Sequence, residues 1–252
     1  MHKPTETSHE GGMESVLVRQ QPIKLKAFAG PDLFGYVAEP EVRTQSGVLI
    51  LPTIFGVNAF AKGYAETLAH AGLTTAVWDL NSGLPLTEDY QECIKRARTL
   101  TDQSADGMIA RWLDALRGDF RLSHLGALGF CIGGRFALLQ AARDRTLAAC
   151  AVAYPSIESP RLANQERDAV SLASTITCPV LMLRPGHDHV TNTDTYAGLT
   201  EALLKRDAPT VIQYYPTAEH GFMHRKVPDA NVAAAKLASP QLIAFLKTCL
   251  GG

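Results

Sequence analysis

Short apolar runs alternate with helix-length segments along most of this 252-residue chain, and this alternation is the strongest constraint on its fold. Runs such as GVLIL at 47–51 and VLML at 180–183 are apolar throughout, not only at every second residue. A strand that is apolar on both sides must be covered on both, and strands separated by helices pair in parallel. The pattern therefore predicts an α/β fold with a mostly parallel central sheet and helices on both faces. The expected strands are 23–28, 34–39, 47–51, 74–78, 125–130, 148–154, 179–184 and 210–215, and the expected helices are 58–71, 103–117, 132–144, 193–206 and 229–249.

The first two expected strands are joined by GPDL at 30–33, a turn signal that is suited to a hairpin. The sheet should therefore begin with an antiparallel hairpin before the parallel strands. The chain is long enough for one sizeable core, and it contains no internal repeat or linker, so we expect a single domain over residues 16–252. Residues 1–15 are polar and rich in Gly, Thr, Ser and His, which predicts a disordered leader.

Composition excludes several classes of function. The formal net charge is −1 and the basic residues are scattered, so we expect no nucleic-acid partner. No stretch approaches the roughly 18 to 20 unbroken apolar residues of a membrane span, and the N-terminus lacks the apolar core of a signal peptide. We therefore expect a cytoplasmic protein with no membrane partner. Nothing in the sequence indicates the oligomeric state.

The chain contains five cysteines without a CxxC pair, a number and spacing that favour reduced thiols over disulfides or a zinc knuckle. One of them, Cys131, lies where a predicted strand meets a predicted helix. The segment GFCIG at 129–133 has the spacing G-x-nucleophile-x-G of a nucleophile elbow, with cysteine in place of the commoner serine. The glycines are needed because this tight turn brings the strand and helix backbones together. The alternative is that Cys131 is an inert core cysteine.

The start of the helix after Cys131 also favours a reactive sulfur. Unpaired backbone N–H groups at a helix N-terminus stabilise a thiolate, and the Ile132 amide is available to a developing oxyanion. A thiol nucleophile further needs a base and an acid that orients the base, and these follow the nucleophile in the order acid, then base. Asp188 comes just after the strand at 179–184, and His220 follows the strand at 210–215, so both should lie at the same sheet edge as Cys131.

Other interpretations of these two residues remain open at this point. Each could be a helix cap or a solvated loop side chain. His220 and His224 are spaced as a zinc pair, yet the glutamate of HExxH is missing, and the alternating side chains of HDH at 187–189 do not converge readily. We therefore expect neither a metal nor another cofactor.

Taken together, the motifs resemble the dienelactone hydrolase family of α/β-hydrolases. The resemblance implies an α/β-hydrolase fold in which Cys131 is the nucleophile, Asp188 orients the imidazole and His220 is the base. It also implies that the backbone amides of Ile54 and Ile132 form the oxyanion hole. The segments that carry it are PTIFGVNAF at 52–60, WDL at 78–80, GFCIGG at 129–134, GHDHVT at 186–191 and AEHGF at 218–222.

The chain departs from the family at the positions that activate the thiol and bind the substrate carboxylate. Thr53 stands where dienelactone-cleaving members carry a glutamate that helps to deprotonate the cysteine. The two arginines of those members fall at about Gly83 and His224, with Arg225 adjacent. His220 and the helix N-terminus are therefore expected to generate the thiolate without a carboxylate at 53.

We predict an acyl hydrolase that cleaves a small ester, lactone or thioester through a covalent acyl-enzyme. Phe55, Asn58 and Tyr154 are the expected substrate-binding residues, and segments 81–104 and 155–172 are expected to cap the pocket. Asn58 has a second interpretation as a helix cap, and Phe55 as a core residue.

Two other functions remain open. The first is a binding or scaffold protein that keeps the fold but has altered catalysis. The second is a class I amidotransferase, which also uses a G-x-C-x-G elbow but requires a His-x-Glu pair, whereas this chain has Glu219 directly before His220.

Overall fold

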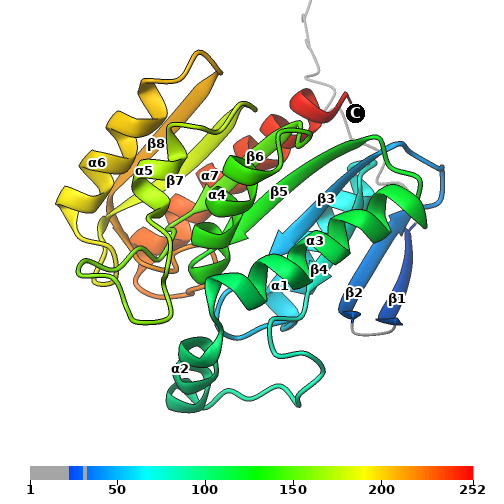
Figure 1. The fold of residues 1–252 in the computed structure, drawn as a ribbon, viewed down its shortest axis with the longest axis horizontal. Helices are drawn as coiled ribbons and strands as arrows, with labels where there is room; N and C mark the ends of the chain where they lie inside the picture. Colours follow the sequence, from blue (N-terminus) through cyan, green and yellow to red (C-terminus); the bar gives the residue numbers. More distant parts are fainter. Residues whose placement is uncertain (1–22, 31–32, 252) are drawn as a thin grey trace, which may run out of the picture.

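An eight-stranded sheet runs through the centre of the computed structural model, which describes residues 23–30 and 33–251 (Figure 1). The strand order is β1-β2-β4-β3-β5-β6-β7-β8. The β1–β2 and β2–β4 pairs are antiparallel, and every pair from β4 through β3 to β8 is parallel. The strands are β1 Ile23–Gly30, β2 Leu33–Pro40, β3 Ser46–Leu51, β4 Thr74–Trp78, β5 His124–Phe130, β6 Ala149–Ala153, β7 Val180–His187 and β8 Thr210–Glu219.

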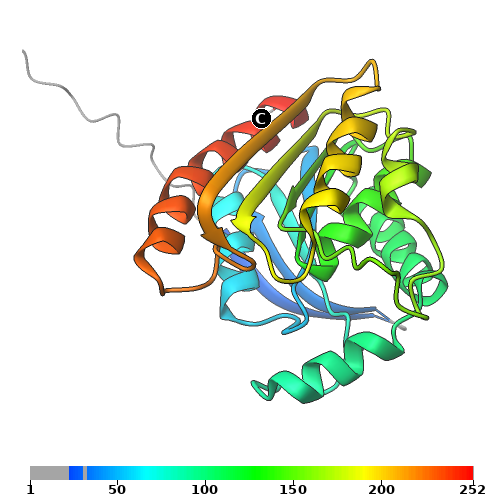
Figure 2. The same ribbon diagram turned by 90° about the vertical axis from the view of Figure 1, so that its left-hand side faces the viewer.

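Helices cover both faces of this sheet (Figures 1 and 2). One face carries α1 Ala59–His70 and α7 Asp229–Leu250, and the other carries α3 Asp102–Gly118, α4 Ile132–Arg143, α5 Ala169–Ala173 and α6 Thr193–Leu204. The remaining helix, α2 Tyr90–Thr99, stands apart from both layers in the two views. None of the helices in the described ranges is long and apolar enough to cross a membrane.

The continuously apolar strands are explained by two separate cores. In β3, Leu49 and Leu51 face the core beneath α3, α4 and α6, whereas Val48 and Ile50 face the core beneath α1 and α7. Successive side chains of a strand point to opposite faces, so a strand buried on both faces must be apolar at every position. The run GVLIL therefore contributes to both cores at once.

The predicted α/β arrangement and the antiparallel hairpin are confirmed, although the middle of the predicted GPDL turn and the predicted leader at 1–15 lie outside the described residues. Two helices were not predicted. The segment of α2, YQECIKRART, is mostly charged and buries only Cys93 and Ala97. Its start is fixed by the Asp89 side chain, which accepts the N–H groups of Gln91 and Glu92. Its apolar residues Tyr90, Cys93, Ile94 and Ala97 have the i, i+3, i+4, i+7 spacing of an amphipathic helix, so the sequence carried a signal for α2 that was missed. The other, α5, is a five-residue helix.

The turn from β5 into α4 leaves no room for side chains at its glycines. A Cβ atom on Gly133 would lie 1.9 Å from the backbone oxygen of Leu51 in β3, and one on Gly129 would lie 2.2 Å from the oxygen of Gly133. Cys131 between them adopts a φ of 57°, a left-handed conformation that is uncommon for a non-glycine residue. The elbow is therefore held in place by its contact with β3.

We expect Gly133→Ala to lower the free energy of unfolding by about 3 kcal/mol or more, because its methyl group meets backbone that cannot move without disturbing the sheet. Urea denaturation followed by circular dichroism measures this change. The matched control is Gly63→Ala in α1, where a Cβ meets nothing within 4 Å, and it should be neutral or stabilising by up to about 1 kcal/mol. Equal stability of the two variants would contradict the steric account.

Candidate active site

Three neighbouring strands deliver the predicted residues to one edge of the sheet. Cys131 directly follows β5, Asp188 directly follows β7 and His220 directly follows β8. These strands run in parallel in the order β5, β6, β7, β8, so their carboxyl ends lie at the same edge. The structure thus brings together side chains that are up to 89 positions apart in the sequence.

Asp188 and His220 form a close pair. The Nδ1 atom of His220 lies 3.0 Å from both carboxylate oxygens of Asp188. The same carboxylate accepts the N–H groups of Val190 at 2.8 Å and Thr191 at 2.9 Å, and the hydroxyl of Tyr196 at 2.8 Å. Burial raises the pKa of Asp188, but the imidazole and the backbone donors outweigh burial and hold this pKa below its ordinary value. Asp188 is therefore a charged acceptor that fixes the orientation of the imidazole ring.

The hydroxyl of Ser156 lies between the sulfur and the imidazole. Its Oγ atom is 3.1 Å from Cys131 Sγ and 3.5 Å from His220 Nε2. Sequence analysis did not identify this residue. A signal was present, because Ser156 is a polar residue just after β6, the strand between β5 and β7. Polar residues at the carboxyl ends of parallel strands are candidates for the site by position alone.

The surroundings of Cys131 favour its thiolate. Burial raises the pKa of the thiol, but the nearby charge of His220, the Ser156 hydroxyl and the Ile132 amide together lower it below its ordinary value. In return, the thiolate and Asp188 raise the pKa of His220 in spite of its burial. The pair therefore favours thiolate and imidazolium over thiol and imidazole.

Two backbone amides are available beside the sulfur. Ile54 and Ile132 line one cavity together with Cys131. Ile132 is the first residue of α4, so its amide has no acceptor within the helix. No acceptor for the Ile54 amide lies in the described part of the chain. Thr53, which precedes it, is buried, and its hydroxyl accepts the Phe55 N–H at 3.3 Å.

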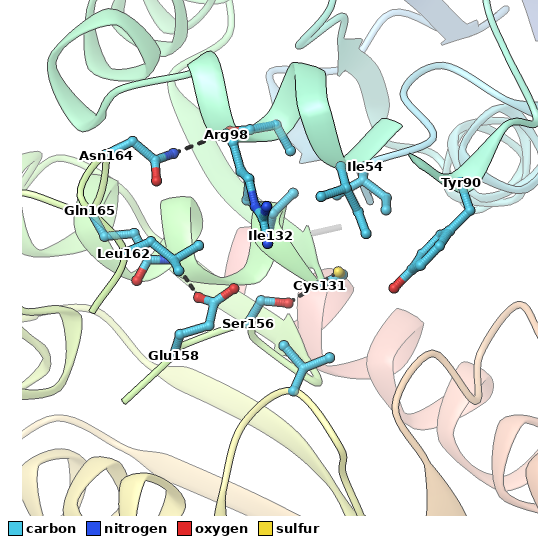
Figure 3. A pocket seen from close by; sticks show the side chains of 13 residues that line it. Ile54, Tyr90, Arg98, Cys131, Ile132, Ser156, Glu158, Leu162, Asn164 and Gln165 are labelled. Atoms are coloured by element: carbon cyan, nitrogen blue, oxygen red, sulfur yellow. Dashed lines mark hydrogen bonds between the residues drawn. The ribbon is translucent and has the colours of Figure 1, made fainter. Parts of the chain in front are cut away.

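The cavity at Cys131 has a volume of about 220 Å³ and is shown in Figure 3. Most of its wall comes from α2 and from the segment after β6, the two regions that were expected to cap the site. The apolar part of the wall is formed by Ile54, Ile94, Ala97, Ile132, Leu162 and Val190. The polar part is formed by Tyr90, Arg98, Ser156, Glu158, Asn164 and Gln165.

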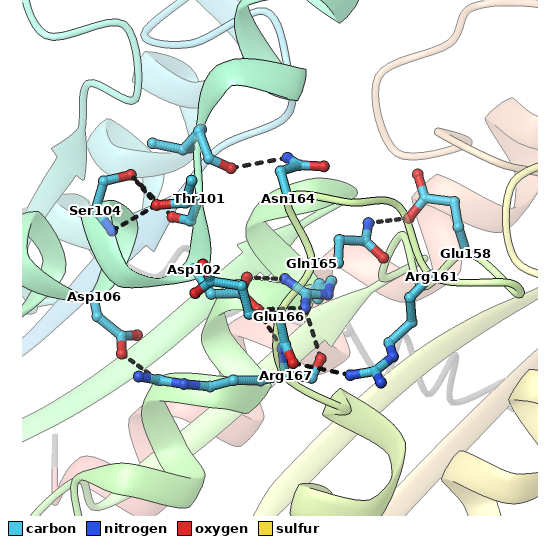
Figure 4. A network of polar contacts seen from close by, with 12 residues as sticks. Thr101, Asp102, Ser104, Asp106, Glu158, Arg161, Asn164, Gln165, Glu166 and Arg167 are labelled. Carbon is cyan, nitrogen blue, oxygen red and sulfur yellow. Dashed lines mark hydrogen bonds and ion pairs between the residues drawn. The ribbon is translucent and has the colours of Figure 1, made fainter.

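Polar contacts attach these two wall segments to the fold (Figure 4). The side chain of Asn164 donates to the backbone oxygens of Ala97 at 3.2 Å and Leu100 at 2.9 Å, where α2 ends. Next to it, Arg135 of α4 forms a buried ion pair with Asp102 and donates to the Arg167 carbonyl at 2.9 Å. Removing one partner of a buried pair leaves an uncompensated charge, so this contact constrains the wall strongly.

The three residues expected to bind substrate lie elsewhere. Phe55 and Asn58 line a separate cavity of about 330 Å³. Asn58 is the N-cap of α1 and accepts the Ala61 N–H at 3.0 Å, in line with its second interpretation. Tyr154 is fully buried, with its ring 5.2 Å from that of His220. The ring of Tyr154 packs edge-to-face against the imidazole of His220. Contact of the three residues with substrate stays a prediction.

His220 and His224 both have protein side chains as neighbours. Within the described ranges, no group of three or more His, Cys, Asp or Glu side chains could hold a metal ion. His220 is engaged by Asp188, and the His224 ring packs against the rings of Phe60 and Tyr154 at 5.3 and 6.2 Å.

Comparisons with known proteins agree with this geometry. Residues 33–250 match the Dienelactone hydrolase family. The chain belongs to this family of hydrolases. A putative carboxymethylenebutenolidase of Yersinia pestis is 27% identical over 216 residues, which are 82% of this chain and 80% of the relative. A probable 2-oxo-3-(5-oxofuran-2-ylidene)propanoate lactonase of Bradyrhizobium is 26% identical over 232 residues, or 88% and 92% of the two chains.

The fold is shared with a solved structure. The crystal structure of a putative dienelactone hydrolase from Klebsiella pneumoniae has a TM-score of 0.74 at 23% identity and covers 89% of this chain and 99% of that chain. The predicted α/β-hydrolase fold is thereby confirmed.

The positions expected to correspond to the two family arginines lie outside the wall of the cavity at Cys131. Gly83 has a φ of 82° and lies against the ring of Phe34. His224 is enclosed by aromatic rings, and Arg225 pairs with Glu219 at 3.3 Å. The charged side chains that line the cavity at Cys131 are instead Arg98 and Glu158.

We expect His224 to make the protein less stable in acid. Burial lowers its pKa to about 4, whereas a histidine in an unfolded chain titrates near ~6.5. As the pH falls from 6.5 to 4, the unfolded chain takes up a proton that the folded protein refuses, so stability is lost across this window. His224→Phe should therefore lose roughly 1–2 kcal/mol less stability than the wild type between pH 7 and 4.5.

Urea midpoints at the two pH values test this expectation. His124→Gln, at an exposed histidine at the start of β5, is the matched control and should follow the wild type. Parallel stability curves for wild type and His224→Phe would show that His224 does not titrate differently on folding.

Proposed function

We propose that the protein is an acyl hydrolase that opens a small lactone or ester through a catalytic triad of Cys131, His220 and Asp188. The observation that carries this proposal is the unbroken series of contacts from Asp188 through His220 and Ser156 to the Cys131 sulfur. A structural role alone does not require a nucleophile, a base and an orienting carboxylate to meet at the mouth of a cavity.

In the first half of the reaction, the Cys131 thiolate attacks the carbonyl carbon and forms a carbon–sulfur bond. The carbonyl oxygen takes the negative charge and accepts hydrogen bonds from the amides of Ile54 and Ile132. When the tetrahedral intermediate collapses, the carbon–oxygen bond to the leaving group breaks and His220 gives its Nε2 proton to the departing oxygen. For a lactone, the new hydroxyl stays attached to the acyl chain.

In the second half, His220 is neutral and takes a proton from a water molecule that attacks the thioester. The resulting tetrahedral intermediate expels the Cys131 thiolate and releases a carboxylic acid, which regenerates the resting ion pair. Asp188 keeps its charge throughout and stabilises the imidazolium. No cofactor is required by this sequence of steps.

The names of the relatives favour the same reaction class, since one is a putative carboxymethylenebutenolidase and another a probable lactonase. The cavity of about 220 Å³ suits a small substrate. Its apolar wall fits an unsaturated or aliphatic acyl group, and its rim of Arg98 and Glu158 fits polar substituents. The surroundings of Cys131 lower the pKa of its thiol, which favours an enzyme over a scaffold protein with the same fold.

We expect Cys131→Ala and His220→Ala each to lower kcat/KM for p-nitrophenyl acetate and a small lactone by at least about 10³-fold, because the members of a triad act as a unit. Asp188→Asn should retain more activity, since the base is still present. Steady-state kinetics on the three variants, with circular dichroism to confirm folding, measures these losses.

The matched control is Cys249→Ala, which removes a partly exposed thiol from α7. It should leave kcat/KM unchanged. Wild-type turnover in Cys131→Ala would show that another group is the nucleophile, and absence of turnover in the wild type on all esters, lactones and thioesters would favour the scaffold alternative.

A further inference from the structure

The hydroxyl of Ser156 lies within hydrogen-bonding distance of both the Cys131 sulfur and the His220 imidazole. Its Oγ atom lies 3.1 Å from Cys131 Sγ and 3.5 Å from His220 Nε2, and the residue is only 5% exposed. The contact with the sulfur is visible in Figure 3. A buried hydroxyl in this position must satisfy its donor and its acceptor within the site.

The position of this hydroxyl is fixed by the backbone around it. The Ser156 N–H donates to the Cys131 carbonyl at 2.9 Å, which ties the serine to the elbow. On either side, Thr191 donates its hydroxyl to the Pro155 carbonyl at 2.7 Å and accepts the Ile157 N–H at 2.9 Å.

Thr191 also connects the serine to the acid of the proposed triad. Its backbone N–H donates to Asp188 at 2.9 Å. One threonine therefore holds both the loop that carries Ser156 and the loop that carries Asp188. A contact made by chance at a mobile surface would not be supported from three directions in this way.

A hydroxyl can bridge the sulfur and the imidazole in both of their protonation states. In the neutral state the thiol donates to Oγ, and the Ser156 hydroxyl donates to Nε2. In the charged state the imidazolium Nε2–H donates to Oγ, and the hydroxyl donates to the thiolate. Both states satisfy every group, because a hydroxyl has one donor and two acceptor positions.

We propose that Ser156 is a catalytic residue through which Cys131 and His220 share their proton. As the thiol proton moves to Ser156 Oγ, the hydroxyl proton moves to His220 Nε2. The products are a thiolate and an imidazolium, and the serine is unchanged. In the charged state the hydroxyl stabilises the thiolate directly. This inference deepens the proposed function and rests on Cys131 being its nucleophile.

Other groups that bear on the charge of the sulfur come from several elements. His220 follows β8, Asp188 follows β7 and Tyr154 follows β6. In the cavity wall, Arg98 comes from α2 and Glu158 from the segment after β6. The Glu158 carboxylate is engaged by the side-chain amide of Gln165. Replacing Ser156 by alanine leaves all of these groups in the protein, so a change in thiol titration reports on the hydroxyl.

The test is the pH dependence of Cys131 alkylation by iodoacetamide, followed by mass spectrometry so that each cysteine is read separately. In Ser156→Ala the titration midpoint should move up by about one unit, because the thiolate loses a donor while the neutral thiol does not. The rate at a pH below both midpoints should fall by about tenfold. The matched control, Ser159→Ala, removes an exposed hydroxyl from the same loop and should not move the midpoint.

A double-mutant cycle with His220→Ala distinguishes a shared proton from local packing. If the hydroxyl connects the two groups, Ser156→Ala should shift the midpoint by less than half as much in the His220→Ala background as in the wild type. Additive shifts, or an unchanged midpoint in Ser156→Ala, would overturn the inference.

The role of Ser156 has to be distinguished from a loss of folding and from a failure of the proposed hydrolase function. Urea midpoints show whether each variant is folded, and Ser156→Gly takes the place of Ser156→Ala if the latter is not, with the same shift expected. The alkylation experiment uses no substrate, so it decides the role of Ser156 even if Cys131→Ala retains hydrolytic activity and the proposed function fails.

Discussion

The close approach of the elbow to the end of β3 is the contact on which the site depends. Gly133 lies so near the Leu51 carbonyl that no side chain fits between them. This approach fixes the start of α4, and with it the Ile132 amide and the Cys131 sulfur. It also brings the segment after β3, which contains Ile54, to the same cavity. One steric contact thus positions the nucleophile and both proposed oxyanion donors, and it explains why two positions of the elbow accept only glycine.

The chain shows that burial alone does not decide the state of a cysteine. Cys150 and Cys178 are buried in the core, and burial raises the pKa of both thiols. Cys131 is partly buried at the wall of the cavity, and its pKa is lowered because an imidazole, a hydroxyl and a helix amide all favour its charged form. The residue type is the same in the three places, so the difference comes from the partners that the strand ends supply.

Much of the fold and the central part of the site can be predicted from the sequence because strong local signals specify them. Every predicted strand is present, since apolar runs such as GVLIL have to be buried on both faces. Cys131, Asp188 and His220 meet because each directly follows a parallel strand. By contrast, α2 was missed although Asp89 caps its start locally, and the contact of Asn164 with its end joins residues more than 60 positions apart, which no local pattern encodes. The backbone on both sides of Ser156 is held by Thr191, a residue 35 positions further along the chain, so no local pattern predicts where the serine lies.

The same distinction separates the residues at the sheet edge from the residues that line most of the cavity. The proposed catalytic groups follow strands at the edge of the sheet, whereas most of the cavity wall comes from α2 and the loop after β6. That wall is attached to the fold by the contacts of Asn164 with the end of α2 and of Arg167 with Asp102 and Arg135. Arg98 and Glu158 take part in none of these contacts, so a substitution at either position should leave the elbow undisturbed. If the proposed function holds, a charged group of the substrate should be recognised at Arg98 or Glu158, because Gly83 and His224 are not among the residues that line the cavity at Cys131.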